Sequence, residues 1–461
     1  MNKGKETNQQ ENQLRREIGA FGGFNILTGI MVGSGIFYLG SYVLMRSGMS
    51  QGLALLVWIL GGVITLISGL CYAELGAMMP ETGGRYIYLR RAYGKIVAFM
   101  SGASGYVLGS CGSIAAIALA AATVCSQIIA LTTIQVKMIA VSIIIILTIV
   151  NYCGVKVGSV VQNIFTIAKL IPIILILGLG IFFGTNSVDL SITPIPATPD
   201  EVLSISEIIQ MTAFAVLATF WAYEGWTNLN VIAGEIKNPK KNLPLAIGTS
   251  IIVVAIIYVL FNFSIYRVLS MDEIKASLDN GALYLGTVAT SKMIGNIGET
   301  LVTITMLIAV IGAVNGCILV FPRALFSMSN DGTFFKYFGK VHQKYNTPST
   351  AIVLTAIISI LLVFSQDLNQ LTTLVTFSAL VFNGLIFVSI YLFRQREPER
   401  ERPYKVWGYP FTPGIAALVM FGMIINTFFT ERNTSILGVS VTVGSLGLYY
   451  LYNYFKKRGI E

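Results

Sequence analysis

Two hydrophobic stretches of this 461-residue chain are each interrupted by a segment that contains glycine. Gly33-Ser34-Gly35 lies inside the apolar run 21–42, and Ala222-Tyr223-Glu224-Gly225-Trp226 lies inside the run 208–232. Glycine allows a membrane helix to unwind, which frees backbone N–H and C=O groups at mid-bilayer depth. Lipid cannot satisfy such groups, so unwound backbone survives only where it lines a cavity. Paired glycine-interrupted segments in the two halves of a chain therefore indicate a transporter's binding site.

The two breaks predict complementary chemistry. A half-helix that begins at Gly33-Ser34-Gly35-Ile36 directs free N–H groups and the positive end of its dipole at the cavity, which suits a carboxylate. Carbonyls released around Trp221, Ala222 and Glu224 suit an ammonium group. Together the breaks fit the zwitterionic head of an amino acid, with Trp221 and Tyr223 as a gate over it. The alternative for each feature alone is ordinary helix packing, since small residues let membrane helices approach closely.

Two charged residues fall inside the predicted spans. Lys169 lies too far from either predicted helix end for comfortable snorkelling, and intramembrane charge indicates a functional site by default. Glu224 stands at the second break, where a carboxylate attracts a cationic side chain, pairs with a neighbouring polar group or carries a proton. The residues alone leave these three roles open.

Composition restricts the class of protein. The chain is 54% hydrophobic and 11% charged, with a mean hydropathy of +0.73, whereas soluble domains carry about 25% charged residues. The net charge of +9 comes from residues scattered between apolar runs, which fits the positive-inside rule better than a nucleic-acid surface. The five cysteines lie in or beside apolar runs and indicate no disulfide framework. The first twenty residues are polar and indicate no cleavable signal peptide.

Twelve segments are long and apolar enough to be membrane helices. They are 20–45, 51–79, 97–130, 137–154, 160–184, 207–233, 244–268, 296–325, 348–365, 369–393, 409–429 and 434–454. With the N-terminus inside, 24 of the 31 Lys and Arg residues are cytoplasmic and six are external. This bias predicts a multi-pass cell-membrane protein with both termini in the cytoplasm. Segment 80–95 is expected to be a cytoplasmic amphipathic loop or short helix, and 184–206 an irregular outer loop.

The expected organisation is a long internal repeat. A cytoplasmic tail, 1–19, precedes a first repeat of five spans, 20–184, and a second repeat of five spans, 207–393. Because five spans is an odd number, the two repeats must be inverted relative to each other. Two further helices, 409–454, and a cytoplasmic tail, 455–461, complete the chain.

Several motifs in order resemble one family over nearly the whole chain. They are REIG at 16–19, GSGIF at 33–37, YAELG at 72–76, TGGRYIY at 82–88, FTIAKL at 165–170, VNG at 314–316 and AYEGWTNLNVIAGEIKNPKKNLPLAI at 222–247. The sequence resembles the amino acid–polyamine–organocation (APC) superfamily, within it the L-amino-acid transporter (LAT) branch and bacterial serine/threonine exchangers. The resemblance implies an all-α membrane protein with the LeuT-type fold: twelve transmembrane helices, a 5+5 inverted repeat with broken helices 1 and 6, and two extra helices.

The resemblance also assigns roles to residues. It implies that the substrate carboxylate binds at Ser34 and Gly35, and that the amino group binds backbone at Trp221, Ala222 and Glu224. Trp221 stands where the family usually has a gating phenylalanine, and Thr227 where it often has asparagine. Lys169 resembles a built-in cation near the Na⁺ site of sodium-coupled relatives, which implies sodium-independent transport. The candidate substrate-binding residues are Gly33, Ser34, Gly35, Ile36, Trp221, Ala222, Tyr223, Glu224, Gly225, Thr227 and Asn315, with Lys169 as the coupling residue.

The leading hypothesis is an amino-acid exchanger working by alternating access, with no catalytic residue, metal or cofactor. Alternatives of the same fold are a proton-coupled symporter, a uniporter, or an exchanger of cationic amino acids or polyamines. A channel needs a helix with a continuous polar stripe, and the sequence shows no such helix. An enzyme would need more than the single loop histidine, His342, and few buried carboxylates. LAT light chains have a cysteine in the outer loop near 131–135 that this chain lacks. No disulfide-linked heavy chain is therefore expected.

Overall fold

The computed structural model describes residues 14–33, 35–126, 129–195, 203–280, 284–365, 368–430 and 432–458, and within them the fold is built from helices without a named strand. The helices that coincide with predicted spans are α2 (Ala20–Met31), α3 (Gly35–Arg46), α4 (Gln51–Met78), α6 (Lys95–Ser104), α7 (Gly112–Ser126), α8 (Thr133–Tyr152), α9 (Val155–Phe183), α10 (Ile205–Tyr223), α12 (Pro239–Val268), α15 (Asn296–Val320), α17 (Ser349–Ser365), α18 (Leu368–Arg396), α19 (Phe411–Thr430) and α20 (Arg432–Lys457). The shorter helices are α5 (Arg85–Tyr93), α11 (Asn228–Val231), α13 (Met271–Asp279), α14 (Leu285–Ile294) and α16 (Pro322–Asn330).

These helices form a multi-span membrane protein. Nine helical segments of the described chain are long and apolar enough to cross a bilayer, and a tenth results if the bent pair α2 and α3 is one span. α17 is apolar but shorter, and α18 runs for 29 residues. The all-helical class predicted from sequence is confirmed, whereas the full count of twelve spans stays a prediction.

Helix starts are specified by local sequence. Thr132 with Gln135, Ser204 with Glu207 and Ser270 with Glu273 form capping boxes at the starts of α8, α10 and α13. In each, the cap hydroxyl accepts a hydrogen bond from a backbone N–H of the first turn, and an oxygen of the Gln or Glu side chain accepts one from the backbone N–H of the cap residue. The helix α13 and its neighbour α14 lie in a connection where no element had been predicted.

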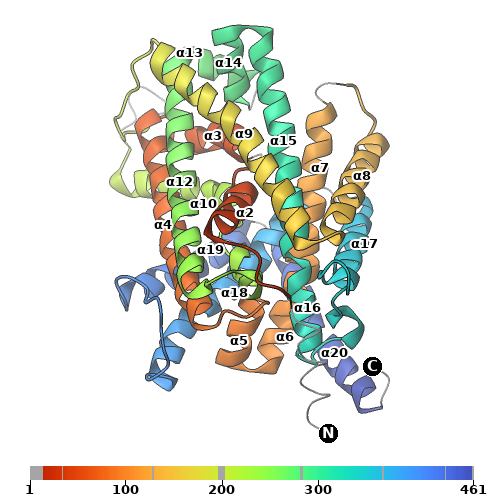
Figure 1. The fold of residues 1–461 in the computed structure, drawn as a ribbon. Coiled ribbons are helices and arrows are strands. Elements are labelled where there is room, and N and C mark those ends of the chain that lie inside the picture. The colour runs from red at the N-terminus through yellow and green to blue at the C-terminus, as the bar shows by residue number, and fades with distance from the viewer. Residues whose placement is uncertain are drawn as a thin grey trace.

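The first broken helix lies at the centre of the bundle. α2 packs against α12, α9 and α15, and Figure 1 shows it enclosed by these longer helices. α10 packs against α3 and α4, so the second half of the first broken helix contacts the helix that precedes the second break. Long-range packing therefore brings together two breaks that are nearly 190 residues apart in the sequence.

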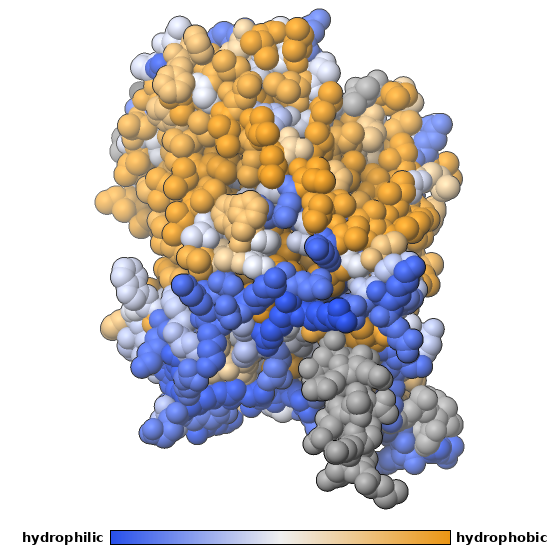
Figure 2. Space-filling model, viewed as in Figure 1, coloured by the Kyte–Doolittle hydropathy of each residue, from blue (hydrophilic) through white to orange (hydrophobic). Residues whose placement is uncertain are grey.

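The two ends of the bundle differ in polarity. Figure 2 shows a broad hydrophobic belt, and hydrophilic residues gather below it around α5, the end that we call the α5 end. The opposite end, which carries α13 and α14 (Figure 1), we call the α13 end. Within 80–95, where an amphipathic loop or a short helix was expected, the helix α5 forms, and residues 184–195 are without regular structure, as expected for part of the predicted outer loop.

A buried ion pair helps to hold the α5 end together. Arg323 on α16 donates through Nε to Glu235 at 2.8 Å, and both side chains are at most 1% exposed. The Glu235 carbonyl accepts from the backbone N–H groups of Glu17 and Ile18, at 3.0 Å each. A buried pair is costly to break because the remaining charge is left without a partner. The chain that follows the second break is therefore fixed to the segment that precedes α2.

One predicted span contains an irregularity. Between α6 and α7 lies a π-helical turn, η1 (Gly105–Cys111). Such turns often occur at functional sites because they shift the register of the side chains that follow. Here Gly105, Gly109 and Ser110 of this turn line a cavity.

Candidate functional site

The first break separates two bent half-helices. α2 ends at Met31, Val32 and Gly33 follow, and α3 begins at Gly35 at an angle of 52° to α2. The Val32 N–H still bonds to the Thr28 carbonyl at 2.9 Å, and the Gly33 N–H bonds to the Met31 carbonyl at 2.8 Å. Ser34, the predicted carboxylate contact, lies outside the described residues.

The second break begins where α10 ends at Tyr223. Glu224 adopts an extended conformation with φ −60° and ψ 143°. Gly225 has φ +117°, a conformation that residues with a side chain rarely adopt. A Cβ atom there would also lie 2.7 Å from Cγ2 of Ile30 on α2. Glycine is therefore required at this position both by backbone conformation and by the close approach of the first broken helix.

The two breaks touch each other. A Cβ atom on Gly35 would lie 3.0 Å from the Cα atom of Ala222, so no side chain fits there without displacing backbone. Tyr258 of α12 lies over both breaks, with its hydroxyl 2.7 Å from the Met31 carbonyl oxygen and 2.8 Å from that of Ala222. A hydroxyl has one proton, so it donates to one of these two carbonyls at a time. Tyr258 therefore links the ends of α2 and α10.

Lys169 binds the end of the first half-helix. Its side chain is completely buried in the middle of α9, and Nζ donates to the Gly29 carbonyl at 2.6 Å and to the Val32 carbonyl at 2.5 Å. These carbonyls lie in the last turn of α2 and at the cap residue that follows it, which is the negative end of the helix dipole. The ammonium thus occupies a position where the electrostatics favour a cation.

A cavity, which we call the break cavity, lies between the two breaks. Its walls include Gly33 and Gly35 from the first break and Trp221, Glu224 and Gly225 from the second. It holds about 570 Å³ of space free of atoms, open solvent at its mouth included. The predicted gate residue Trp221 is thus a wall of the cavity.

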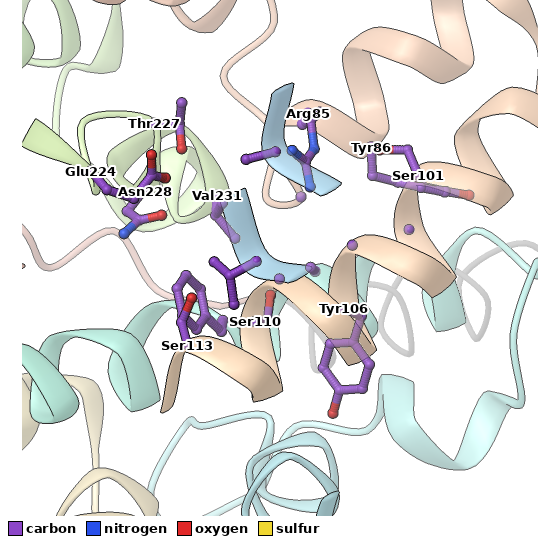
Figure 3. Close-up of a pocket in the computed structure, with 18 of the residues that line it drawn as sticks. Arg85, Tyr86, Ser101, Tyr106, Ser110, Ser113, Glu224, Thr227, Asn228 and Val231 are labelled. Carbon is purple, nitrogen blue, oxygen red and sulfur yellow. The ribbon is translucent and has the colours of Figure 1, made fainter. Parts of the chain in front are cut away.

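A second cavity, which we call the vestibule, continues from Glu224 to α5. It shares Ser113, Glu224, Asn228 and Phe321 with the break cavity and holds about 750 Å³ on the same measure. Figure 3 shows the labelled side chains around it. Glu224, Thr227 and Asn228 come from the second break, Tyr106, Ser110 and Ser113 from η1 and α7, and Arg85 and Tyr86 from α5.

The remaining predicted site residues, Ile36, Ala222, Tyr223 and Asn315, line neither cavity. Ile36 and Ala222 are buried beside the break cavity but are not among its lining residues. Tyr223 is fully buried and donates to the Trp58 carbonyl at 3.0 Å, away from both cavities. Asn315 is also fully buried and bonds to Gln162 at 2.8 Å and Asn151 at 2.9 Å, which joins α15 to α9 and α8.

Four residues that sequence reasoning did not select contribute to this region: Tyr258, Ser113, Asn228 and Arg85. Asn228 lies within the longest family motif and could have been noticed there, and Arg85 lies within another. Ser113 and Tyr258 belong to ordinary apolar helices and had no local signal. Within the described residues, no group of three or more His, Cys, Asp or Glu side chains is placed to hold a metal ion.

A multi-span helical bundle with two touching helix breaks at an internal cavity defines a membrane transporter. Residues 18–447 match the amino acid permease family, and the chain belongs to that family. It is 31% identical over 453 residues to the serine/threonine exchanger SteT of Bacillus subtilis, covering 97% of this chain and 99% of the relative. It is 31% identical to mouse b(0,+)-type amino acid transporter 1, with coverage of 98% and 90%. It is also 30% identical to mouse large neutral amino acids transporter small subunit 2, with coverage of 96% and 82%.

The comparisons confirm the APC and LAT resemblance inferred from the motifs. The protein is an amino-acid transporter and not an enzyme.

Proposed function

We propose that this transporter is a sodium-independent amino-acid exchanger that works by alternating access. The substrate zwitterion binds at the break cavity, with its carboxylate toward the half-helix that begins at Gly35. Its ammonium group lies toward the carbonyls around Trp221 and Glu224. The observation that carries this proposal is the contact of the two breaks at one cavity, because paired broken helices supply N–H groups on one side and carbonyls on the other.

The hydrogen bonds of Lys169 support the proposal that transport is not coupled to sodium. The C-terminal carbonyls of a half-helix are a typical site for a coupling cation in transporters. Here two of those carbonyls, on Gly29 and Val32, already accept hydrogen bonds from the ammonium of Lys169. A second cation at the same carbonyls would meet electrostatic repulsion in a region of low dielectric.

The topology proposed with this function is the LeuT-type fold with twelve spans. Its repeats are 20–184 and 207–393, its last two helices 409–454. The α5 end is the cytoplasmic end, because Lys and Arg residues concentrate in the segments assigned there. Both tails, 1–19 and 455–461, are then cytoplasmic, and the protein resides in the cell membrane. The carrier acts without a disulfide-linked heavy chain, since 131–135 has no cysteine.

The test is uptake of radiolabelled serine, threonine or alanine into proteoliposomes, with and without amino acid inside. Exchange predicts that internal amino acid accelerates uptake strongly and that a Na⁺ gradient has no effect. Uptake into empty vesicles that rises steeply with a Na⁺ gradient would refute the proposal.

A second experiment tests the zwitterion site. Amino acids should compete with the labelled substrate, whereas their amides, N-acetyl forms and decarboxylated amines should compete poorly. If a decarboxylated amine bound as well as its parent amino acid, the carboxylate assignment to Ser34 and Gly35 would be wrong.

The second candidate is proton-coupled symport, which the half-buried Glu224 favours because its carboxylate lines both cavities. In that case an inwardly directed proton gradient would drive accumulation into vesicles without internal amino acid. Glu224→Gln would abolish this accumulation while exchange continued.

A further inference from the structure

The vestibule contains two opposite charges. Among the described residues that line it, Arg85 and Glu224 carry the only charged side chains, and the others are neutral polar or apolar. Figure 3 shows them as sticks, with Glu224 on the second break and Arg85 on α5. The Arg85 guanidinium acts electrostatically on the Glu224 carboxylate, and both act on the hydroxyl of Tyr72. Because both residues line this cavity, both charges contribute to its electrostatic potential.

Among the described residues, the Arg85 guanidinium has no direct hydrogen-bond or ion-pair partner. A Cβ atom on Gly105 of the π-helical turn would lie 2.5 Å from Nη2 of Arg85, so the guanidinium occupies space left by that glycine. Its Cζ atom lies 5.5 Å from the ring centroid of Phe382, a cation–π distance. None of the hydrogen bonds or ion pairs between described residues involves the guanidinium, whereas Arg90 and Arg91 of the same helix pair with Asp331 and Glu81. Arg85 thus presents its charge to the vestibule.

A substrate side chain would meet both charges. Ser113, Glu224 and Asn228 line the break cavity and the vestibule alike. A side chain that projects from a zwitterion at the breaks along this shared wall passes Glu224 and points toward Arg85. A cationic side chain is then attracted by the carboxylate and repelled by the guanidinium, while a neutral polar one can bond to the hydroxyls of Ser110 and Ser113.

We infer that Arg85 is a specificity-determining residue that balances Glu224, so that the carrier selects amino acids with neutral polar side chains and rejects cationic ones. This inference rests on the proposed amino-acid exchange. It assigns Glu224 to a charge pair that sets the potential of the vestibule, where sequence alone left open a cation site, a polar pairing and a proton site.

The experiment measures competition of lysine, ornithine, serine, glutamine and glutamate against labelled exchange in proteoliposomes. The variants are Arg85→Gln, which removes the charge, and Arg85→Lys, which keeps it. Arg91→Gln is the matched control, because Arg91 is an exposed arginine of the same helix that does not line the vestibule. The quantity compared is the ratio of the inhibition constants of ornithine and glutamine at constant pH.

Arg85→Gln should raise the relative affinity for ornithine and lysine about tenfold or more, since repulsion between unit charges in one cavity is only partly screened at an effective dielectric constant of about 20. Arg85→Lys and Arg91→Gln should keep the wild-type ratio. Glu224→Gln should shift the ratio in the opposite direction and improve competition by glutamate. This second variant tests the inference even if Arg85→Gln fails to fold.

Unchanged ratios in Arg85→Gln and Glu224→Gln, alongside normal wild-type exchange, would overturn the inference and leave the proposed function standing. Equal shifts in Arg85→Gln and Arg91→Gln would also overturn it, because the effect would then come from surface charge. Absence of amino-acid exchange in the wild type would instead refute the proposed function.

Discussion

Replacement of Lys169 by alanine should slow transport far more than it weakens substrate binding. The ammonium makes two hydrogen bonds to backbone carbonyls of α2 at a fully buried site. A hydrogen bond to a charged group contributes about 1.5–3 kcal/mol, so Lys169→Ala removes about 3–6 kcal/mol from the conformation in which both bonds are made. Because 1.4 kcal/mol corresponds to tenfold in an equilibrium, even the lower value shifts the balance between two conformations by about 100-fold.

Substrate binding should change less, because Lys169 lines neither the break cavity nor the vestibule. We expect a drop of about 100-fold in exchange rate with a change in the dissociation constant below about tenfold. The assays are exchange in proteoliposomes and equilibrium binding to purified protein. Lys137→Ala is the matched control, because its Nζ also donates to a backbone carbonyl, that of Phe364 at 3.1 Å, but at an exposed site. Equal losses of binding and rate in Lys169→Ala, or an equal effect of Lys137→Ala, would refute the reasoning.

Two further changes test the contact between the breaks, and a third tests the selectivity for the substrate side chain. Gly35→Val should abolish exchange, because a Cβ at Gly35 meets the backbone of the second break. The control Gly178→Val should be tolerated, since a Cβ there has no neighbour within 4 Å. Size-exclusion profiles of both variants check folding. Tyr258→Phe should lower the exchange rate more than Tyr223→Phe, since only Tyr258 joins both breaks. Each variant removes one hydroxyl whose hydrogen bond contributes about 1 kcal/mol, so similar rates would refute this role. Glu224→Gly should shift relative affinity from lysine, arginine and ornithine toward bulky neutral amino acids, and an unchanged competition ranking would contradict the expected selectivity.

The sequence was sufficient to predict features that depend on local pattern. Hydropathy located the segments that form the long helices, because a span of about 20 apolar residues is a property of the chain alone. Glycines at both breaks and the lysine in mid-span departed from that pattern, and the structure places all of them where α2 and α10 end. The helices α13 and α14 were missed, because each is too short to show as an apolar run.

Side-chain direction was less predictable. Trp221 and Tyr223 are two residues apart on α10, so about 200° of helix rotation separates them and they cannot both face one cavity. Only the packing decides which does: Trp221 lines the break cavity, and Tyr223 points to Trp58. Asn315 was likewise predicted to line the cavity. Its amide instead forms hydrogen bonds that join α15 to α9 and α8. A polar residue inside a span specifies that a partner exists but not which one.

The carbonyls at the end of α2 explain why exchange is the transport mode that we expect. The Thr28 carbonyl accepts from Val32, those of Gly29 and Val32 accept from Lys169, and that of Met31 lies within reach of both Gly33 and Tyr258. These donors belong to the protein, so a movement of α2 must break bonds within the protein. A ligand shifts a conformational equilibrium only by its differential affinity for the two states. On the proposed absence of sodium coupling, the substrate itself is the ligand that supplies that difference, and movement of the loaded carrier in both directions then produces exchange.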